Sequence, residues 1–309
     1  MLNLHLQNTL PMDPDPQPTM TVDRCIEQIA AQLQSANLFY GHGAVDAQSE
    51  ALWIVSKQLD LSPAEALDHL DDVIDLKDQA AAFRFASARI QTRKPLAYIL
   101  GEAWLMGVPF FCSEQSIVPR SWIAELIAND SLEPWLPADG KALDLCTGNG
   151  SLAILLALAC PDIQVSACDI SLPALAVASR NLDRHGLSSQ IDLLNGDLWA
   201  ALPEPNDDNR FDLILCNPPY VNSKSMSALP AEYHAEPELA LAGGEDGMDL
   251  IRRIIAGAPD YLTERGALLI EIGNEYENFK KAFPQIPAIW MEVSAGEEQV
   301  LLIQAEDLR

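Results

Sequence analysis

The sequence predicts an α/β protein in which a small N-terminal helical bundle precedes a mostly parallel, seven-stranded sheet that ends in an antiparallel hairpin. Apolar residues recur at helix spacing from Thr21 to about Arg93, and strand and helix patterns alternate after Arg120. Such alternation is typical of a parallel sheet covered by helices on both faces. The 309 residues are enough for two domains, on a prior of roughly 150 residues each.

The N-terminal third predicts a flexible segment followed by helices. Four prolines from Pro11 to Pro18 fix φ and remove backbone donors, so residues 1–19 are expected to be extended or disordered. Helical patterns cover residues 49–59 and 78–90, and Ser62-Pro63-Ala64-Glu65 has the composition of a capped helix start. An apolar stripe on the first helix comprises Val22, Cys25, Ile26, Ile29, Ala30 and Leu33. We therefore expect a helical domain over residues 20–94.

Glycine and proline interrupt aromatic and β-branched runs from Pro95 to Val118, which predicts a hairpin linker over residues 95–118. A second domain then spans residues 119–309 and starts with a helix from Trp122 to Ala128. Its expected strands cover residues 142–146, 164–170, 191–198, 211–217, 266–273, 288–294 and 299–304, with helices at residues 151–159, 172–184 and 248–262. The last two strands form the terminal hairpin.

Acidic residues dominate the charge of the chain. Nineteen Lys and Arg against 45 Asp and Glu leave a formal charge of −26. A surface that neutralises the phosphates of duplex DNA is therefore not expected, whereas a basic partner is favoured. No apolar run approaches the roughly 20 residues that span a bilayer. Because no apolar leader precedes the first basic residue, Arg24, we expect a cytoplasmic protein with no membrane attachment.

The cysteines and histidines have no metal-binding spacing. No two cysteines form a C-x-x-C pair, and the five histidines lie far from one another. The sequence thus predicts no metal site and mostly buried thiols. The cysteines are Cys25, Cys112, Cys146, Cys160, Cys168 and Cys216.

The first strand of the sheet leads into a glycine loop. The run from Asp144 to Ser151 enters an apolar helix, and Gly148 and Gly150 allow a tight turn and the close approach of a ligand. Nineteen residues after Gly150, Asp169 ends the second strand, where a carboxylate can accept hydrogen bonds from both hydroxyls of a ribose. Together these residues predict a nucleoside-containing cofactor.

Two cofactors compete for this loop. Gly148-x-Gly150-x-x-Ala153 with Asp169 also satisfies the dinucleotide fingerprint. The Asp144 carboxylate separates them, because it would repel a pyrophosphate but attract the ammonium group of S-adenosylmethionine. In the alternative interpretation, Asp144 only caps amides of the loop.

Asp197 and Leu198 follow the third strand at the same edge of the sheet. Either the Asp197 side chain or the Leu198 backbone is expected to hold the adenine amino group, with the Leu198 side chain packed on the ring. In the alternative interpretation, Asp197 caps the helix that begins at Trp199.

The fourth strand delivers Asn217-Pro218-Pro219-Tyr220 to the edge that carries the glycine loop. The two prolines hold the Asn217 side chain and the Pro218 carbonyl rigidly. When a planar amide or exocyclic amine attacks a methyl group, positive charge builds on its nitrogen. Two rigid acceptors can then bind its protons, aim its lone pair and stabilise that charge.

This scheme needs no strong general base, and Tyr220 would stack on the flat substrate group. We therefore predict Asn217, Pro218 and Tyr220 as catalytic residues, and Asn217, Pro218, Pro219 and Tyr220 as the substrate clamp. The alternative is a strand-end turn with a stacked aromatic ring.

These motifs resemble those of amino-methyltransferases with the class I S-adenosylmethionine fold. The helical bundle, Val118-Pro119-Arg120 and the run from Glu236 to Gly247 make the chain similar to the protein glutamine-N5 methyltransferases, which modify translation components. Within this family, the chain is more similar to the branch that acts on the third large-subunit ribosomal protein. The similarity lies in Cys146 in place of the first glycine, in Ser121 after Arg120 and in the run from Leu229 to Tyr233. The resemblance to the release-factor branch is weaker. The resemblance to the glutamine-N5 methyltransferases covers about residues 20–305.

The resemblance implies S-adenosylmethionine as the cofactor and N5 of a glutamine in a large-subunit ribosomal protein as the methyl acceptor. Cys146 replaces a glycine, and Leu198 stands where release-factor enzymes often have an aromatic residue, so looser packing of the adenine is expected. The helical domain would recognise the substrate, and its acidic surface would steer a basic protein. The expected cofactor contacts are Asp144, Cys146, Thr147, Gly148, Asn149, Gly150, Asp169, Asp197, Leu198 and Asn217.

The stretch from Glu236 to Asp249 has two interpretations. It is either a solvated acidic loop or a lid over the clamp, hinged at Gly243-Gly244 and Gly247.

The linker contains two adjacent aromatic residues, and an arginine follows it. Phe110 and Phe111 either line the cofactor pocket or pack within the linker. Arg120 is expected to pair with a carboxylate and to hold the domains together.

Other functions explain fewer of these residues. An adenine-N6 DNA methyltransferase uses a similar tetrapeptide on a flipped base, but the chain has no basic composition to support DNA binding. An NAD oxidoreductase leaves Asn217 to Tyr220 unexplained. A non-catalytic adaptor would tolerate Asn217→Ala.

Overall fold

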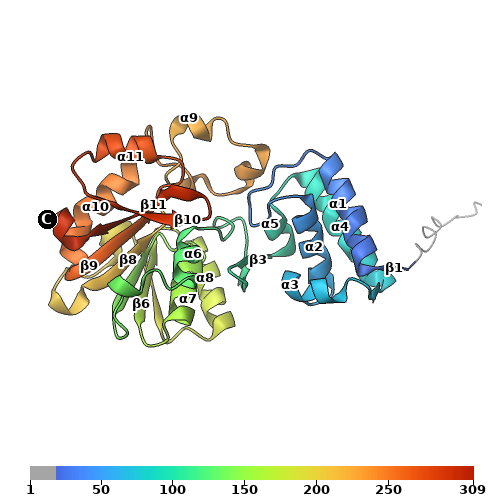
Figure 1. Ribbon diagram of the computed structural model, residues 1–309, viewed down its shortest axis with the longest axis horizontal. Helices are drawn as coiled ribbons and strands as arrows, with labels where there is room; N and C mark the ends of the chain where they lie inside the picture. Colours follow the sequence, from blue (N-terminus) through green and yellow to red (C-terminus); the bar gives the residue numbers. More distant parts are fainter. Residues whose placement is uncertain (1–18) are drawn as a thin grey trace, which may run out of the picture. The chain divides into compact units, whose positions relative to one another are not determined.

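The computed structural model describes residues 19–309, which divide into two units (Figure 1). The helical unit contains residues 19–38 and 44–92, and the sheet unit contains Phe39–Gly43 and Arg93–Arg309. The lead-in expected from the prolines at residues 11–18 lies outside the described residues. Within residues 19–309, no helix is both long and apolar enough to cross a membrane.

In the helical unit, α1, α2 and α4 pack against one another. The elements are β1 (Met20–Thr21), α1 (Val22–Ser35), α2 (Ala47–Gln58), α3 (Pro63–Ala66), η1 (Leu67–His69), β2 (Val73–Ile74) and α4 (Leu76–Thr92). The apolar stripe predicted on the first helix is buried throughout. The predicted capping box is also present, since the Ser62 hydroxyl accepts from the Glu65 amide at 3.1 Å and the Glu65 carboxylate accepts from the Ser62 amide at 2.8 Å. Both predictions are confirmed.

A buried ion pair joins α2 to α4. Arg89 Nε donates to both carboxylate oxygens of Glu50, at 3.1 and 3.0 Å, and both side chains are almost fully buried. The mutual attraction offsets the cost of removing the two charges from water only while both are present. The sequence did not predict this contact, because its partners lie 39 positions apart on different helices and share no local pattern.

The sheet unit contains the predicted seven-stranded sheet. The strands are β5 (Lys141–Leu145), β6 (Gln164–Asp169), β7 (Ile191–Asn195), β8 (Phe211–Cys216), β9 (Leu262–Glu271), β10 (Ile289–Val293) and β11 (Gly296–Gln304). Their order across the sheet is β10-β11-β9-β8-β5-β6-β7. The five strands β5 to β9 are parallel, whereas β11 pairs antiparallel with β9 and β10. The mostly parallel sheet and its terminal hairpin are confirmed.

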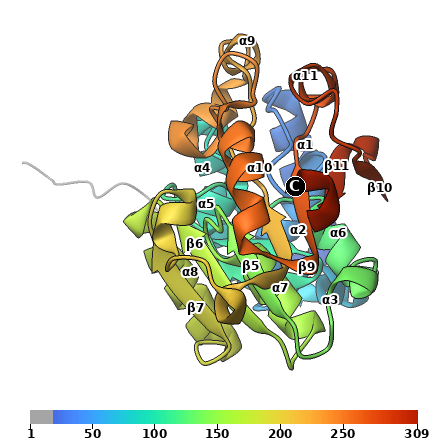
Figure 2. The ribbon, with the colours of Figure 1, turned by 90° about the vertical axis from the view of Figure 1, so that its left-hand side faces the viewer.

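Helices cover both faces of this sheet (Figures 1 and 2). On one face lie α6 (Ile123–Ala128), α7 (Ser151–Ala159) and α8 (Leu172–His185), and on the other α10 (Asp249–Tyr261) and α11 (Tyr276–Ala282). In β8, Leu213 and Leu215 belong to the core beneath α7, whereas Ile214 and Cys216 belong to the core beneath α10. Burial on both faces explains why the central strands are apolar at successive positions.

Three strand boundaries differ from the predicted ones by three or more residues, among them that of the last strand, which begins at Gly296 rather than at Gln299. The third strand of the sheet, expected to reach Leu198, ends at Asn195, because the Gly196 amide bonds the Asp169 carbonyl at 3.1 Å and Leu198, at φ 52°, turns the chain into η3 (Leu198–Ala201). The fifth strand begins at Leu262 rather than at Gly266. The chain passes directly from α10 into β9, where Leu262 lies opposite Phe211.

The hairpin predicted between Pro95 and Val118 is present as β3 (Glu102–Leu105) and β4 (Val108–Phe111), preceded by α5 (Leu96–Leu100). Phe110 is fully buried in the core, and the Phe111 ring lies 4.4 Å from the guanidinium carbon of Arg180. Both rings pack against protein, so the pocket-lining interpretation is wrong. The remaining short elements are η2 (Glu133–Trp135), η4 (Asp207–Asn209), α9 (Ser223–Met226), η5 (Ala231–Ala235), η6 (Glu238–Ala240) and η7 (Ala305–Leu308).

Replacing Glu50 by Gln is expected to destabilise the helical unit by about 3 kcal/mol, because the buried Arg89 charge loses the negative charge that compensates it. Hydrogen exchange of the α2 and α4 amides in the full chain would measure the loss. Glu27→Gln, which removes an exposed pair with Arg24, is the matched control and should cost less than about 1 kcal/mol. Equal losses in the two variants would contradict the assignment.

Candidate active site

A cavity of about 450 Å³ opens at the carboxyl edge of the sheet. From β5 the chain adds β6 and β7 on one side and later β8 and β9 on the other, so the order reverses between β5 and β8. Ligands of doubly wound sheets bind at such a switch point, and the volume lies in the range of small-molecule sites. The predicted site residues in the cavity wall are Cys146, Gly148, Asp169, Asp197, Leu198, Asn217 and Pro219.

Two segments of the cavity wall contain none of the predicted cofactor-binding or substrate-binding residues. They are residues 115–117, which follow the β3–β4 hairpin, and residues 237–240, which include η6. Each segment lies beside a motif that the sequence analysis noted, Val118-Pro119-Arg120 or Glu236-Pro237. These motifs could have pointed to the two segments. The lid interpretation for the stretch that starts at Glu236 remains a prediction.

The two glycines of the loop have different structural roles. Gly148 has φ 58°, and a Cβ atom at this residue would meet no other atom within 4 Å. Gly150 has φ 82°, and a Cβ atom there would lie 3.2 Å from Ala178 Cβ on α8. Gly148 therefore keeps the cavity side of the loop clear, whereas Gly150 allows α7 and α8 to pack closely. Cys146, where the resemblance suggested a glycine, also adopts a positive φ, 65°.

Asp144 lies beneath the loop and is almost completely buried. Its Oδ2 accepts from Thr147 Oγ1 at 2.5 Å and from the Ala153 amide at 3.1 Å, while Oδ1 is buried without a hydrogen-bond partner. Asp144 thus binds the Thr147 hydroxyl in the loop and an amide in the first turn of α7, rather than amides of the loop itself, and it is not among the residues of the cavity wall. Burial raises its pKa to about 7, although the hydrogen bonds from Thr147 and Ala153 act in the opposite direction.

Thr147 and Asn149 are buried in the loop. Asn149 Oδ1 accepts from the Ser151 amide at 3.2 Å, and its carbonyl accepts from Asn181 Nδ2 at 3.0 Å. Asn181 also bonds the Phe111 backbone from its fully buried position on α8. This side chain, which the sequence did not single out, fixes the loop to the hairpin.

Asp169 holds the loop from the next strand. Its Oδ2 accepts from the Gly148 amide at 2.9 Å and its Oδ1 from the Ser171 amide at 2.8 Å. Each carboxylate oxygen can accept a further hydrogen bond, and the residue lies in the cavity wall. Burial raises the pKa of Asp169.

Asp197 does not cap the helix that follows it, because its side chain makes no capping hydrogen bond. It pairs instead with Arg253 on α10, at 2.8 Å. The capping interpretation is therefore wrong. Leu198 is buried and contributes an apolar side chain to the cavity wall.

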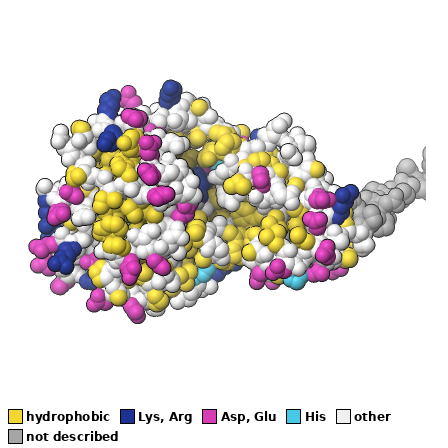
Figure 3. All heavy atoms as spheres, viewed as in Figure 1, with side chains coloured by type: hydrophobic (Ala, Val, Ile, Leu, Met, Phe, Trp, Pro, Cys, Tyr) yellow, Lys and Arg dark blue, Asp and Glu magenta, His cyan; other side chains and the backbone are white. Residues whose placement is uncertain are grey.

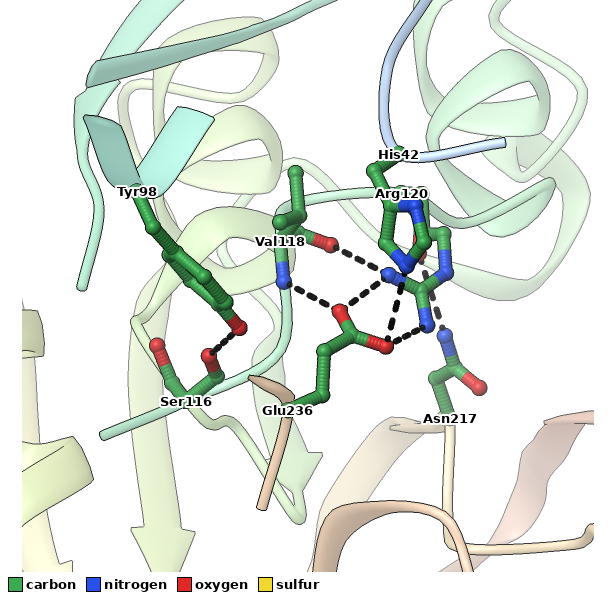
Figure 4. A network of polar contacts seen from close by, with 7 residues as sticks. All are labelled: His42, Tyr98, Ser116, Val118, Arg120, Asn217 and Glu236. Atoms are coloured by element: carbon green, nitrogen blue, oxygen red, sulfur yellow. Dashed lines mark hydrogen bonds and ion pairs between the residues drawn. The ribbon is translucent and has the colours of Figure 1, made fainter. Parts of the chain in front are cut away.

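The Asn217 amide has one defined orientation. Its Nδ2 donates to the Arg120 carbonyl at 3.4 Å (Figure 4). A carbonyl can only accept, so the amide nitrogen must face it and Oδ1 is left as the acceptor on the other side. Asn217 lies in the cavity wall beside Pro219.

Two glycines pack closely against Tyr220, Gly273 against its ring and Gly247 against its main chain. A Cβ atom at Gly273 would lie 2.5 Å from Tyr220 Cε2, and one at Gly247 would lie 2.3 Å from the Tyr220 carbonyl oxygen. The Tyr220 hydroxyl donates to Glu271 Oε1 at 3.2 Å. Burial raises the pKa of Tyr220, and the charge of Glu271 adds to this effect.

A buried carboxylate, Glu236, binds the segment that carries the Arg120 carbonyl (Figure 4). Glu236 Oε1 accepts from the Val118 amide at 3.0 Å and from Arg120 Nη1 at 2.5 Å, and Oε2 accepts from Arg120 Nη2 at 2.6 Å. His42 Nε2 lies 3.6 Å from Oε2. Burial raises the pKa of Glu236, but the charges and hydrogen bonds of Arg120 and His42 outweigh burial and lower it to about 2.

The expected ion pair of Arg120 is therefore confirmed. Both partners belong to the sheet unit, so the expectation that this pair holds the two domains together is wrong. Since Glu236 is buried, the interpretation of its stretch as a wholly solvated loop is also wrong.

The sheet order and the site at its switch point define a class I methyltransferase fold. Residues 126–232 match the family model of the methyltransferase small domain, and residues 26–101 match that of the PrmC N-terminal domain.

Three curated relatives are ribosomal protein uL3 glutamine methyltransferases. The protein of Bordetella pertussis is 44% identical, with 94% of this chain and 97% of the relative covered. That of Burkholderia pseudomallei is 43% identical, with 96% and 98% covered, and that of Bradyrhizobium diazoefficiens is 41% identical, with 90% and 88% covered. The chain belongs to the ribosomal protein uL3 glutamine methyltransferase family.

The raised pKa of Asp144 predicts a pH-dependent stability. The folded state binds this proton more tightly than the unfolded state, so the stability that Asp144 contributes is complete below about pH 4 and is lost as the pH rises through about 7. Asp144→Asn keeps an acceptor for Thr147 and Ala153 but does not titrate. The melting temperature of the ligand-free wild type should therefore fall relative to that of the variant between pH 4 and pH 8. A difference that stays constant with pH would contradict this assignment.

Proposed function

We propose that this chain transfers a methyl group from S-adenosylmethionine to N5 of a glutamine in ribosomal protein uL3. The observation that carries the proposal is the orientation of Asn217. Its Oδ1 is left as an acceptor in the wall of a cavity that also contains Gly148 and Asp169. The names of the curated relatives support uL3 as the substrate.

The residues around the cavity fit S-adenosylmethionine. Gly148 leaves open the space that a side chain would fill, Asp169 retains acceptor capacity for ribose hydroxyls, and Leu198 provides an apolar surface for the adenine. Asp197 is the candidate for the adenine amino group. Cys146, Thr147, Asn149 and Gly150 shape the loop, and Asp144 acts by holding that loop from beneath. The bound cofactor supplies an electrophilic methyl group on its sulfonium.

The tetrapeptide binds and orients the glutamine amide. Asn217 Oδ1 and the Pro218 carbonyl accept the two protons of the amide nitrogen, which aims the nitrogen lone pair at the methyl group. As positive charge develops on the nitrogen, these acceptors stabilise it more strongly than they stabilise the neutral amide. Pro219 keeps the Pro218 backbone extended, and Tyr220 packs on the flat amide.

No side chain in this scheme must remove a proton before transfer. The Tyr220 hydroxyl is bound to Glu271 and its raised pKa keeps it protonated, so it serves as a fixed contact rather than as a base. Once the methyl group is attached, the cationic amide is a strong acid and loses its proton to water.

Methyl transfer to three acceptors tests the function. Purified protein with labelled S-adenosylmethionine should label uL3, and hydrolysis should release N5-methylglutamine, whereas a peptide release factor and duplex DNA should stay unlabelled. Label on the release factor would overturn the substrate, and label in DNA would overturn the reaction.

The Asn217→Ala variant should reduce kcat by about 10² to 10³, the typical loss when one positioned transition-state hydrogen-bonding group is removed. Asn129→Ala, at an exposed position after α6, is the matched control and should retain wild-type activity. Wild-type activity in Asn217→Ala would show that the clamp is assigned wrongly.

The acidic surface is expected to accelerate binding of a basic substrate. The formal charge is −26, and Figure 3 shows Asp and Glu side chains spread over the displayed face. kcat/KM for intact uL3 should fall as ionic strength rises from 50 to 500 mM, because salt screens charges separated by more than about 10 Å at 0.1 M. An uncharged glutamine-containing peptide is the control, and its kcat/KM should change little. Identical salt dependence for both substrates would exclude steering.

A further inference from the structure

One short segment, residues 118–122, contacts the first residue of the Asn-Pro-Pro-Tyr tetrapeptide directly and is joined to the last by a shared carboxylate. Its Arg120 carbonyl accepts from Asn217 Nδ2 at 3.4 Å. At the other end, Glu271 links the segment to Tyr220. Glu271 Oε2 accepts from Ser121 Oγ at 2.6 Å and from the Trp122 amide at 2.9 Å, and Oε1 accepts from the Tyr220 hydroxyl. The segment is therefore tied to Asn217 at one end of the tetrapeptide and, through Glu271, to Tyr220 at the other.

Glu236 binds the first part of this segment, from Val118 to Arg120, which carries the carbonyl that Asn217 contacts. One of its oxygens accepts from the Val118 amide, and both bind the guanidinium fork of Arg120. The Arg120 carbonyl lies between these attachments and the next one, at Ser121. Val118 is fully buried and the Glu236 side chain is inaccessible to solvent, so water cannot readily replace these contacts.

The orientation of the Asn217 amide depends on that carbonyl. The oxygen and nitrogen of a side-chain amide are nearly equal in size, so packing alone does not distinguish the two orientations. In the observed orientation, Oδ1 is available to accept a proton from the substrate amide. In the reverse orientation, an NH2 group would meet the NH2 group of the glutamine, and neither could accept. A displaced Arg120 carbonyl would remove the contact that selects the productive orientation.

We propose that Glu236 is a positioning residue for methyl transfer, which holds the Arg120 carbonyl and thereby orients the Asn217 amide toward the substrate nitrogen. This inference rests on the proposed function, because it assumes that Asn217 accepts a proton of the glutamine amide. Glu236 itself contacts neither substrate nor cofactor. Its effect should therefore appear in kcat and only through Asn217.

The test is a double-variant cycle of Glu236→Gln and Asn217→Ala, with kcat measured on uL3 at saturating S-adenosylmethionine. Glu236→Gln removes one charge with almost no change in shape. Alone, it should lower kcat by about 10- to 100-fold, the order expected from a small misplacement of a reacting group. The dissociation constant of S-adenosylmethionine, measured by calorimetry, should stay within about twofold of the wild-type value.

In the Asn217→Ala background, Glu236→Gln should cause little additional loss, because the group that it orients is absent. A merely structural role predicts losses that multiply in the double variant, and that result would overturn the proposal. Wild-type kcat in Glu236→Gln would overturn it as well. If the wild type itself transfers no methyl group to uL3, it is the proposed function that fails.

Two further variants keep the test decisive. Glu264→Gln makes the same chemical change at an exposed position near the start of β9 and should leave kcat unchanged. If Glu236→Gln does not fold, as judged by its melting curve, the same cycle is run with Arg120→Lys. This variant keeps the cation and the main-chain carbonyl but loses the two-pronged contact with Glu236. The same coupling with Asn217→Ala is expected, and multiplicative losses would again contradict the proposal.

Discussion

The parallel hydrogen bonding of β5 with β8 is the constraint on which the site depends. Leu145 lies opposite Cys216, so the glycine loop and the Asn-Pro-Pro-Tyr tetrapeptide leave the sheet at the same level on adjacent strands. A shift in this register would separate the loop from the residues that face the substrate. Each strand is apolar on both faces and sits between two helical layers, so such a shift would also disturb both cores.

Buried carboxylates then organise the backbone at this edge. Asp144 binds the glycine loop, Glu236 binds the segment before Arg120, and Glu271 binds the segment after it. In each case a carboxylate accepts from a main-chain amide and from at least one side chain. Such sites are costly to desolvate and are stable only when fully bonded, which makes the geometry that they impose specific. The acidic composition thus contributes to the interior of the site as well as to the surface.

The sequence predicted the parts of the molecule that depend on local patterns. The Ser62 capping box, the α1 stripe and the Gly148 turn involve residues within a few positions of each other, and the structure contains all three. The strand containing Asp144 and the strand before Asn217 were placed at one edge because alternating strands and helices leave few other topologies.

Contacts between distant residues were not predictable in the same way. Arg120 and Glu236 are 116 positions apart, and the sequence indicated that Arg120 needs a carboxylate but not which one. Asp197 carried a capping signal, yet it pairs with Arg253 because the packing of α10 brings that cation close. Tertiary packing determines which partner each of these side chains binds, and local sequence patterns carry no information about that packing.

A crystal structure of the protein with S-adenosylhomocysteine and the glutamine-containing segment of uL3 would test the central claim most directly. We expect the glutamine Nε2 to lie about 3 Å from both Asn217 Oδ1 and the Pro218 carbonyl, with Asn217 Nδ2 still directed at the Arg120 carbonyl. A glutamine amide bound away from these two oxygens, or an Asn217 amide with its nitrogen toward the substrate, would contradict it.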